Sequence, residues 1–513
     1  MPTRYVHTNI VSKDWQTLAR FYQEVFDCRA VPPKRDLSGD WLARGTAVPN
    51  AAFQGIHLRL PGHGDDGPTL EIYQYSVFEP NDEPLANRKG FGHIAFRVDD
   101  LGLIFALTAS FLWILNTLYS VGYMRAHNEH KQTRFYICFA AAIAAAMGAA
   151  FSSNLLSLFV FYEALTLVTY PLVIHAETPV AKAGARRYLI YLLGLSIAFQ
   201  LPALFMVKAY GGTFEFHAEG LLRASTASAG TLSLIFILFL LGIGKAALMP
   251  FHSWLPAAMV APTPVSALLH AVAVVKAGVF TVSRVVFHVF GVKLLGDLGV
   301  NEVLVFMACF TIVTASLIAL AQDNLKRRLA YSTIAQLSYV LLGVGLLVPD
   351  AQVGGLAHIG FHAAAKITLF FCAGAILVAT HKTKVSQLDG IGRRMPITMG
   401  AFTVGTLAMI GLPPTAGLVS KWFLEEGAAA GGHLGVHVVL LVSTMLNGAY
   451  FLPIVWRAFF RPAPDGQTGW KEAPWPCVVA LSATALLTIL LFFFPGVVLD
   501  LARGVVSAAG GVR

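Results

Sequence analysis

From Leu101 onward the sequence repeats apolar runs of about 20 residues, and this pattern constrains the fold more than any other feature. A helix of that length crosses the ~30 Å hydrocarbon core of a bilayer. Hydrophobic residues make up 56% of the chain and charged residues only 13%, which excludes an ordinary soluble domain. We therefore predict an all-α polytopic membrane protein with about twelve transmembrane helices. The predicted spans are 101–124, 135–152, 154–175, 187–209, 231–249, 264–287, 303–321, 329–348, 354–379, 396–423, 435–460 and 476–500.

The first hundred residues are polar and belong to a different class. Strand-like alternation at Arg4–Val11, Gly55–Leu60, Thr69–Tyr75 and Gly92–Val98, with an amphipathic helix at Asp14–Phe26, predicts a small soluble α+β half-module. We therefore expect two domains, residues 1–100 and residues 101–513.

Basic residues cluster between alternate predicted spans, which places the clusters on one side of the membrane. By the positive-inside rule that side is cytoplasmic, so topology explains the net charge of +9 better than a nucleic-acid partner does. The clusters are Arg125/Lys131/Arg134, Lys182/Arg186/Arg187, Lys326/Arg327/Arg328, Lys382/Lys384/Arg393/Arg394 and Arg457/Arg461/Lys471.

The sequence offers no motif for a cofactor. The five cysteines have no CxxC spacing, and there is no GxGxxG or GxxxxGK[ST] motif. We therefore expect no redox cofactor and no catalytic site of the chain's own.

Ionisable residues nevertheless interrupt the apolar spans. Lys245, His270 and Lys276 lie in one stretch, and a charge in hydrocarbon costs ~2.5–3.5 kcal/mol even on mild scales, so such residues normally face a protein interior or a water-filled path. Burial lowers the pKa of a lysine in general, whereas a neighbouring carboxylate raises it. Glu163 is the acid that we pair with Lys245, and a purely structural ion pair is the alternative.

His358, His362 and Lys366 are spaced four residues apart, so they form one stripe on a helix face. This stripe predicts proton conduction; polar core histidines bonded to backbone are the alternative. Lys421 is a weaker candidate, because Glu425 at i+4 also explains it as an ion pair at the end of a span. Thr263 and Ser266 form a polar face with His270, which we interpret as part of a wet path. Ser332, Gln336 and Tyr339 form another, which helix-to-helix hydrogen bonding explains better.

Proline and glycine predict two broken helices, one over Met249–Pro264 and one over Gly411–Gly417. Such breaks persist in a membrane only where they are buried in protein or line a cavity. Both adjoin a lysine, Lys245 or Lys421. Interrupted segments in two halves of a chain indicate internal repeats with the ion path at the breaks.

The segments GKAALMPFHSWLPAAMVAPTPVSALLHA, YSTIAQLSY, HIGFHAAAKITLFFCAG and GLPPTAGLVSKW resemble antiporter-like membrane subunits of proton-pumping NADH:quinone oxidoreductase, multisubunit sodium/proton antiporters and membrane-bound hydrogenases. FYEALTLVTYPLVIH resembles the D-type subunit of the antiporters most closely, and the likeness covers residues 101–500. It implies two inverted repeats, each with a broken helix. It also implies a relay made of a Glu163–Lys245 pair, His270 and Lys276 as connecting residues, a central Lys366 and an exit residue Lys421.

The N-terminal segment resembles the vicinal oxygen chelate (glyoxalase-like) superfamily in YVHTNI, FYQEVF, LEIY and GHIAFRVDD. Such domains pair two βαβββ modules, and only one module and the next strand are present. The resemblance implies a vestigial divalent-metal site at His7, Glu71 and His93. If the basic loops are cytoplasmic, this segment lies outside, without a secretory signal. Either a misassembled reading frame joined near Val98–Leu101 or a working fusion accounts for it.

The leading functional hypothesis is a proton-translocating subunit of an NADH:quinone oxidoreductase-like or multisubunit cation/proton antiporter complex in the inner (plasma) membrane. Its partners are other membrane subunits and the lipid bilayer. A secondary Na+(K+)/H+ exchanger without redox coupling and a metal-dependent glyoxalase-like enzyme are the alternatives.

Overall fold

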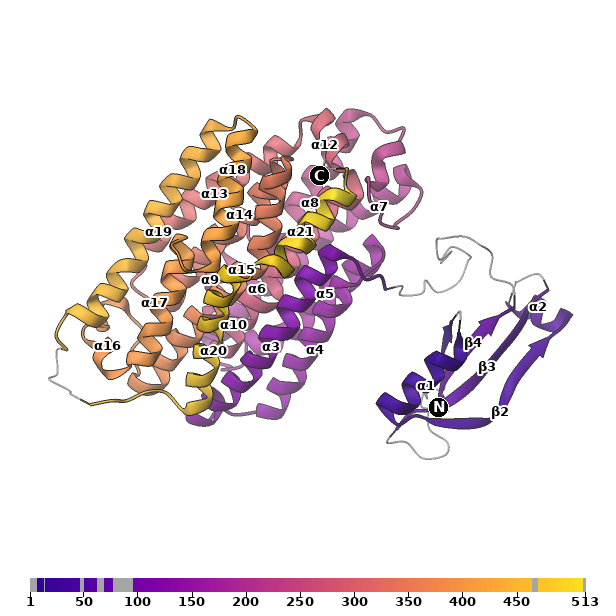
Figure 1. The fold of residues 1–513 in the computed structure, drawn as a ribbon, viewed down its shortest axis with the longest axis horizontal. Coiled ribbons are helices and arrows are strands. Elements are labelled where there is room, and N and C mark those ends of the chain that lie inside the picture. The colour runs from indigo at the N-terminus through magenta and orange to yellow at the C-terminus, as the bar shows by residue number, and fades with distance from the viewer. Residues whose placement is uncertain are drawn as a thin grey trace. The chain divides into compact units, whose positions relative to one another are not determined.

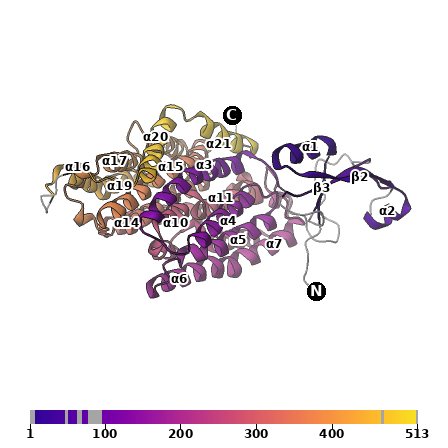
Figure 2. The same ribbon diagram turned by 90° about the horizontal axis from the view of Figure 1, so that it is seen from below.

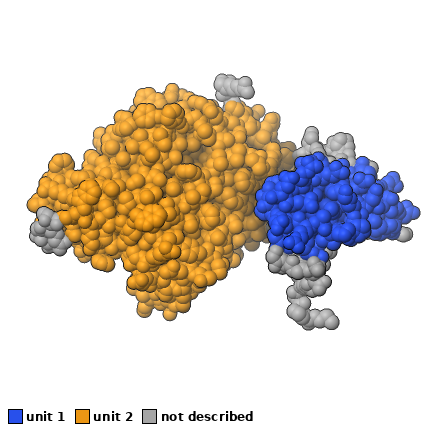
Figure 3. All heavy atoms as spheres, turned by 60° about the horizontal axis from the view of Figure 1, so that its bottom comes forward, with its two compact units in different colours: residues 1–93 blue, residues 94–513 orange. Residues whose placement is uncertain are grey.

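The computed structural model describes residues 7–12, 14–46, 50–61, 69–76, 96–463 and 469–510. The chain divides into two compact units, Met1–His93 and Ile94–Arg513, which Figure 3 colours separately. Each unit has its own apolar core, as expected for segments that bury their own hydrophobic faces.

The first unit is a four-stranded sheet with helix α1 (Trp15–Phe26) (Figure 1). The strands β1 (His7–Val11), β2 (Arg29–Ser38), β3 (Ala52–Arg59) and β4 (Thr69–Tyr75) lie in the order β1-β4-β3-β2. The β1–β4 pair is parallel and the other two pairs are antiparallel. Asp14 caps α1, because its carboxylate accepts hydrogen bonds from the backbone N–H groups of Gln16 and Thr17.

Strand β2 was not predicted, and its composition explains the omission. Pro32 and Pro33 lie inside it and cannot donate to a β ladder, so the segment does not have the pattern of a strand. The sheet accommodates them because β2 is an edge strand, with a bulge between Val31 and Arg35. Most of the predicted strand Gly92–Val98 lies outside the described residues.

The second unit is helical (Figures 1 and 2). Each predicted span contains a helix. Within the described residues, nine helical segments are long and apolar enough to cross a membrane: α3 (Asp100–Ala126), α4 (Gln132–Ala150), α5 (Leu155–Val173), Pro179–Gly211 (α6 and α7), Thr263–Phe290 (α10 and α11), α13 (Asn301–Ala321), α15 (Pro349–Thr380), α19 (Leu434–Phe460) and α20 (Trp475–Phe493). The other helices include α14 (Leu325–Gly345), which is as long as α13, and the shorter α8 (Ala229–Gly242), α17 (Pro396–Ile410), α18 (Ala416–Ala430) and α21 (Gly496–Ala508).

Three predicted spans end differently in the structure. The span 231–249 ends at Gly242, and 396–423 is divided between α17 and α18. The span 476–500 ends at Phe493, because Pro495 separates α20 from α21. In each case the helix ends near a proline, which has no N–H to donate, or near a glycine, which disfavours a helical backbone.

Of the nine segments two form the interior of this unit, together with α14, which is buried over almost its whole length. Thr263–Phe290 is buried throughout its most apolar window, and α15 is 83% buried there, whereas the other seven are at most 44% buried. Helix α15 packs against α3, α14, α17 and α18, as Figures 1 and 2 show. Peripheral helices expose large apolar side chains such as Phe306 and Met445, which suits a lipid-facing surface.

The basic loops share one face, as the sequence predicts. Lys131 and Arg134 both bind the Glu177 carboxylate, at 2.7 and 2.8 Å, which joins the α3–α4 loop to the α5–α6 loop. Hydrogen bonding to these two cations lowers the pKa of Glu177 to about 2. On the same face the backbones of Asn324 and Lys384 form an isolated antiparallel β-bridge, and the Arg457 guanidinium binds the Asp389 carboxylate at 2.7 Å.

Residues 96–99, at the suspected junction, belong to the helical unit. Asp99 caps α3 by accepting a hydrogen bond from the Gly102 N–H at 2.7 Å. Its carboxylate also binds the buried Arg284 guanidinium through two bonds of 2.5 and 2.7 Å. The N–H of Arg97 donates to the Phe151 carbonyl, so the chain is anchored before the first long helix begins.

Candidate functional site

The titratable residues that the sequence singles out lie in the interior of the helical unit. Lys245, His270, Lys276, His358, His362 and Lys366 have no exposed surface, and Lys421 is 7% exposed. None of their charges therefore reaches lipid headgroups, and protein or internal water must stabilise them.

The first predicted break is present. Helix α8 ends at Gly242, a short 3-10 turn (Gly244–Ala246) carries Lys245, and helix resumes at α9 (Trp254–Ala257). Gly278 of α11 (Val274–Arg284) packs on this turn so closely that a Cβ there would lie 2.2 Å from the Ala246 nitrogen. The indole of Trp254 donates to the Gly244 carbonyl at 3.0 Å, which satisfies one group that the break frees.

Lys245 contacts α5 beside the predicted acid and not the acid itself. Its Nζ donates to the Tyr162 carbonyl at 2.7 Å and lies 3.1 Å from the centroid of the Tyr162 ring. Among the described residues no ion pair within 4.0 Å joins it to Glu163. Both carboxylate oxygens of Glu163 are buried without a hydrogen-bond donor from the described residues. A carboxyl in that setting requires water or a bound proton.

The centre of the site is a direct contact between a lysine and a histidine. Lys276 Nζ lies 2.8 Å from His362 Nδ1, joining α11 to α15. At that distance the amine and the imidazole nitrogen form a hydrogen bond, and which of them donates depends on the His362 tautomer. The other ring nitrogen of His362 has no hydrogen-bond partner among the described residues, which leaves it open to a water molecule.

His358 lies one turn away, and its ring is parallel to that of His362 at a centroid distance of 5.5 Å. Its Nδ1 lies 2.8 Å from Ser420 Oγ of α18, and its Nε2 lies 3.0 Å from Gln336 Oε1 of α14. Both nitrogens are occupied, so His358 connects three helices. Ser420 adjoins Lys421, which brings the second break next to the central stripe.

Lys366 continues the stripe by another turn. Its Nζ donates to Ser332 Oγ at 2.9 Å, and the Tyr450 hydroxyl donates to the same oxygen at 3.1 Å. No carboxylate touches this lysine among the described residues. The Ser332 hydroxyl oxygen therefore accepts a hydrogen bond from the amine and another from Tyr450, which makes a short polar network around Lys366.

The second break is also present, because α17 ends at Ile410 and α18 begins at Ala416. Lys421 Nζ donates to the Met409 and Ile410 carbonyls at 2.7 and 2.9 Å, which are the last carbonyls of α17. Glu425 instead pairs with His437 at 2.5 Å. The ion pair that the i+4 spacing suggests is therefore not the contact that Lys421 makes.

His270 differs from the prediction in its contacts. It lies in a π-helical turn (Leu268–Val272), and its ring packs on Phe370 at 4.6 Å. Neither of its nitrogens has a hydrogen bond to the described residues. It borders the stripe on α15 without a direct bond to it.

Several partners could not be found from sequence alone. Tyr162 lies far in the chain from Lys245, Ser420 from His358, and Tyr450 from Ser332. Ser332 and Gln336 do form the predicted polar face of α14, and they bind Lys366 and His358. A serine or glutamine that repeats on one face of an apolar helix is the signal that marks such partners.

A cleft of about 460 Å³ opens on the basic face beside the first break. Its lining comes from α6, from the segment 253–260 after the turn of Lys245, and from the start of α14, and includes Arg187, Ser253 and Arg327. Polar side chains at its wall suit water entry toward the break.

The predicted metal ligands of the first unit are only partly described. Glu71 of β4 lies 3.4 Å from His57 Nδ1 and accepts a hydrogen bond from the Tyr73 hydroxyl at 3.1 Å. His93 lies outside the described residues, and only the backbone of His7 is described. The implied three-residue set stays a prediction.

Comparisons with known proteins agree with this architecture. The family model for the transmembrane region of NADH:quinone oxidoreductase and Mrp antiporter subunits matches residues 152–447, more than half of the chain. The chain is 33% identical over 419 residues to NADH-quinone oxidoreductase subunit N of Desulforudis audaxviator, which covers 79% of this chain and 81% of that protein. It spans only 49% and 66% of two longer relatives, an NAD(P)H-quinone oxidoreductase chain 5 and an NADH-quinone oxidoreductase subunit L.

Two solved structures have the same fold. A chain of the Mrp complex from Dietzia sp. superposes with a TM-score of 0.71 at 21% identity, covering 80% of this chain and 84% of that chain. A chain of respiratory complex I from Thermus thermophilus superposes with a TM-score of 0.64 at 28% identity, covering 82% and 89%.

The fold and the buried lysine–histidine site thus define an antiporter-like, multi-pass membrane subunit. The chain belongs to the NADH:quinone oxidoreductase/Mrp antiporter transmembrane family. It is a proton-translocating subunit of the kind found in these complexes.

Proposed function

We propose that this chain relays protons through Glu163, Lys245, His270, Lys276, His358, His362, Lys366 and Lys421 as one subunit of a larger membrane complex. The 2.8 Å contact between Lys276 and His362 carries the proposal, because it joins two buried titratable groups from different helices. Relatives in NADH:quinone oxidoreductase and Mrp complexes support the assignment to a multisubunit assembly.

The relay has three parts in this proposal. Glu163 and Lys245 load a proton at the first break, next to the cleft on the basic face. Lys276 and His362 pass it to the stripe on α15, where His358 leads toward Lys421 and Lys366 lies one turn on. Water bridges the steps without a direct bond, from Lys245 to Lys276 and past His270. Two positive charges repel strongly in this low-dielectric interior, so loading one lysine favours release from the next.

We propose that about twelve helices span the membrane, in two inverted repeats that each contain one of the breaks. The two breaks, at 243–253 and 411–415, support this arrangement, since each adjoins a lysine and a helix end. The proposed location is the inner membrane, with the basic loops in the cytoplasm.

The central test is Lys366→Ala in the assembled complex, reconstituted in proteoliposomes. We expect proton translocation to fall about 100-fold, since proton-transfer groups contribute on that scale. Lys293→Ala changes an exposed lysine and is the matched control. Undiminished translocation in Lys366→Ala would remove the central assignment.

A secondary Na+(K+)/H+ exchanger is the second candidate, which the likeness to an Mrp complex favours. It predicts cation-dependent proton flux without an electron donor. Flux that requires both quinone and a reductant, and is indifferent to Na+, contradicts the exchanger.

For the first unit we propose a glyoxalase-like half-module. The order β1-α1-β2-α2-β3-β4, with β1 parallel to β4, is a βαβββ unit with a short extra helix, α2 (Asp40–Thr46), and supports this fold. A peptide spanning Val98–Leu103, sought in native membranes by mass spectrometry, tests whether the two units occur in one polypeptide. Native chains that begin elsewhere would show that the junction is not translated.

A further inference from the structure

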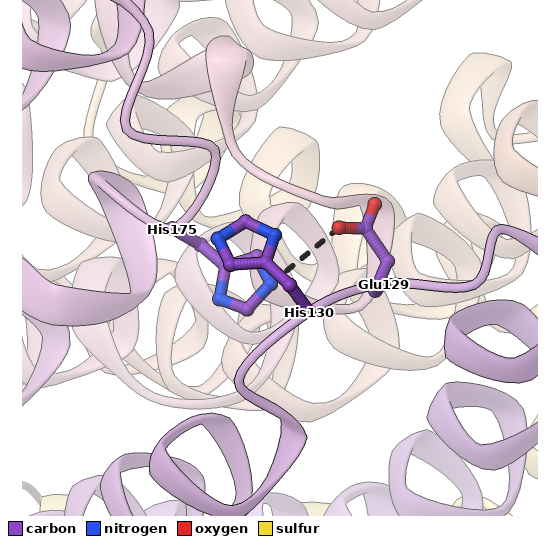
Figure 4. A group of neighbouring side chains, drawn as sticks. All are labelled: Glu129, His130 and His175. Carbon is purple, nitrogen blue, oxygen red and sulfur yellow. Dashed lines mark ion pairs between the residues drawn. The ribbon is translucent and has the colours of Figure 1, made fainter.

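Three potential metal ligands meet on the basic face, away from the relay. Glu129 and His130 lie in the α3–α4 loop, and His175 directly follows α5 (Figure 4). One ligand atom from each lies within 4.8 Å of the others. His175 Nε2 is 3.5 Å from Glu129 Oε2, and the rings of His130 and His175 stack at a centroid distance of 4.8 Å.

His175 is the unusual member of this cluster. Its side chain has no exposed surface, and neither ring nitrogen forms a hydrogen bond with a described residue. A buried polar group left without a hydrogen bond costs about 1–3 kcal/mol. The side chain nevertheless faces the Glu129 carboxylate and the His130 ring, so a ligand held by all three would satisfy it (Figure 4).

The charges around the cluster balance, and the carboxylate within it attracts a cation. The two nearby cations, Lys131 and Arg134, are bound by the Glu177 carboxylate at 2.7 and 2.8 Å. That single carboxylate offsets one of the two positive charges, and Glu129 is the carboxylate that faces the imidazoles. His130 is exposed, so an ion can reach the cluster from solvent.

We propose that Glu129, His130 and His175 bind a divalent transition-metal ion of the zinc class, with water as the remaining ligand. Two imidazole nitrogens and one carboxylate oxygen form a ligand set that Zn²⁺ accepts in an open tetrahedral site. Bonds of about 2.0–2.2 Å place tetrahedral ligands about 3.4 Å apart, so the cluster must contract. The exposed His130 can supply most of that movement by rotating its side chain.

The bound ion would tie the α3–α4 loop to the end of α5. Helix α5 carries Tyr162 and Glu163, so the site holds the helix that forms one side of the first break. Metal binding by the three ligands does not depend on the proposed relay, and it can be measured without proton flux.

The test uses the full-length chain in its assembled complex, treated with chelator and then titrated with Zn²⁺ alone by calorimetry and with Co²⁺ alone by absorption spectroscopy. We expect each wild-type chain to bind one more metal ion than the His175→Gln variant binds. We expect Glu129→Gln and His130→Gln each to weaken binding at least about tenfold. His217→Gln, which changes a histidine on another loop, is the matched control and retains wild-type binding.

His130→Gln alters an exposed side chain and keeps the test valid if His175→Gln fails to fold. The proposal is overturned if the wild-type complex takes up no Zn²⁺ that the Glu129 and His130 variants lose. It is also overturned if His217→Gln weakens binding as much as they do.

Discussion

The two helix breaks both place a buried lysine against backbone carbonyls, but its contacts differ. At each break a lysine ammonium donates to backbone carbonyls and lies over a tyrosine ring: Lys245 over Tyr162 at 3.1 Å, and Lys421 over Tyr339 at 5.1 Å. A break in an apolar helix frees polar backbone groups. Lys421 satisfies the last carbonyls of α17, whereas at the first break the Trp254 indole satisfies the Gly244 carbonyl.

The carboxylates distinguish the two breaks. Glu425 lies on the same helix as Lys421 and pairs with the half-exposed His437. Glu163 comes from a neighbouring helix and has no donor among the described residues. Lys421 also binds the carbonyls of its own break, whereas Lys245 binds a carbonyl of another helix. This difference predicts that the proposed relay loads its proton at the first break, where the acid has no ion-pair partner among the described residues, and not at the second.

The largest expected contrast is between the two acids. Glu163→Gln removes the carboxylate whose oxygens are buried beside the first break, so we expect proton translocation to fall about 100-fold. Glu425→Gln should change it less than about twofold, since that carboxylate is partly exposed and paired with histidine. Translocation by the reconstituted complex measures both. Equal losses in the two variants would remove the distinction between the breaks.

The next prediction concerns the contact between Lys276 of α11 and His362 of α15. Lys276→Met and His362→Met should each lower translocation about tenfold or more. The double variant should be no slower than the slower single variant, because both remove one shared step. Thr368→Val, whose hydroxyl bonds within α15, is the control and should retain most activity. Independent, multiplying losses would show that the two residues act in separate steps.

The smallest effect is expected in packing at the first break. Gly278→Ala places a methyl group against the backbone of Lys245 and Ala246, so we expect a loss of stability of about 1–3 kcal/mol. Thermal unfolding in detergent measures it. Gly400→Ala in α17 meets nothing within 4 Å and should be neutral or stabilising. A neutral Gly278→Ala would mean that the close approach of α11 to this turn is not required.

Much of the membrane fold follows from sequence, because bilayer thickness sets the length of each apolar run and local periodicity sets its faces. The stripe of His358, His362 and Lys366 was predictable for the same reason, since helical geometry alone aligns residues four apart. The breaks were predictable from proline and glycine. Strand β2 was missed, since two prolines obscure an edge strand whose partner is distant in sequence.

The partners of the titratable residues were not predictable. Nothing local indicates that Lys276 meets His362, that Lys366 meets Ser332, or that Lys245 binds beside Glu163 and not to it. The cluster of Glu129, His130 and His175 was also missed, because its members lie on two loops that only the pairing of α4 with α5 brings together.

The sequence by itself determined that this chain is helical, lies in a membrane and keeps ionisable residues inside it, because these properties depend on composition and on spacing within single helices. Only the tertiary structure decided which helices are central and which titratable side chains contact one another, because those contacts arise from packing between segments far apart in the chain.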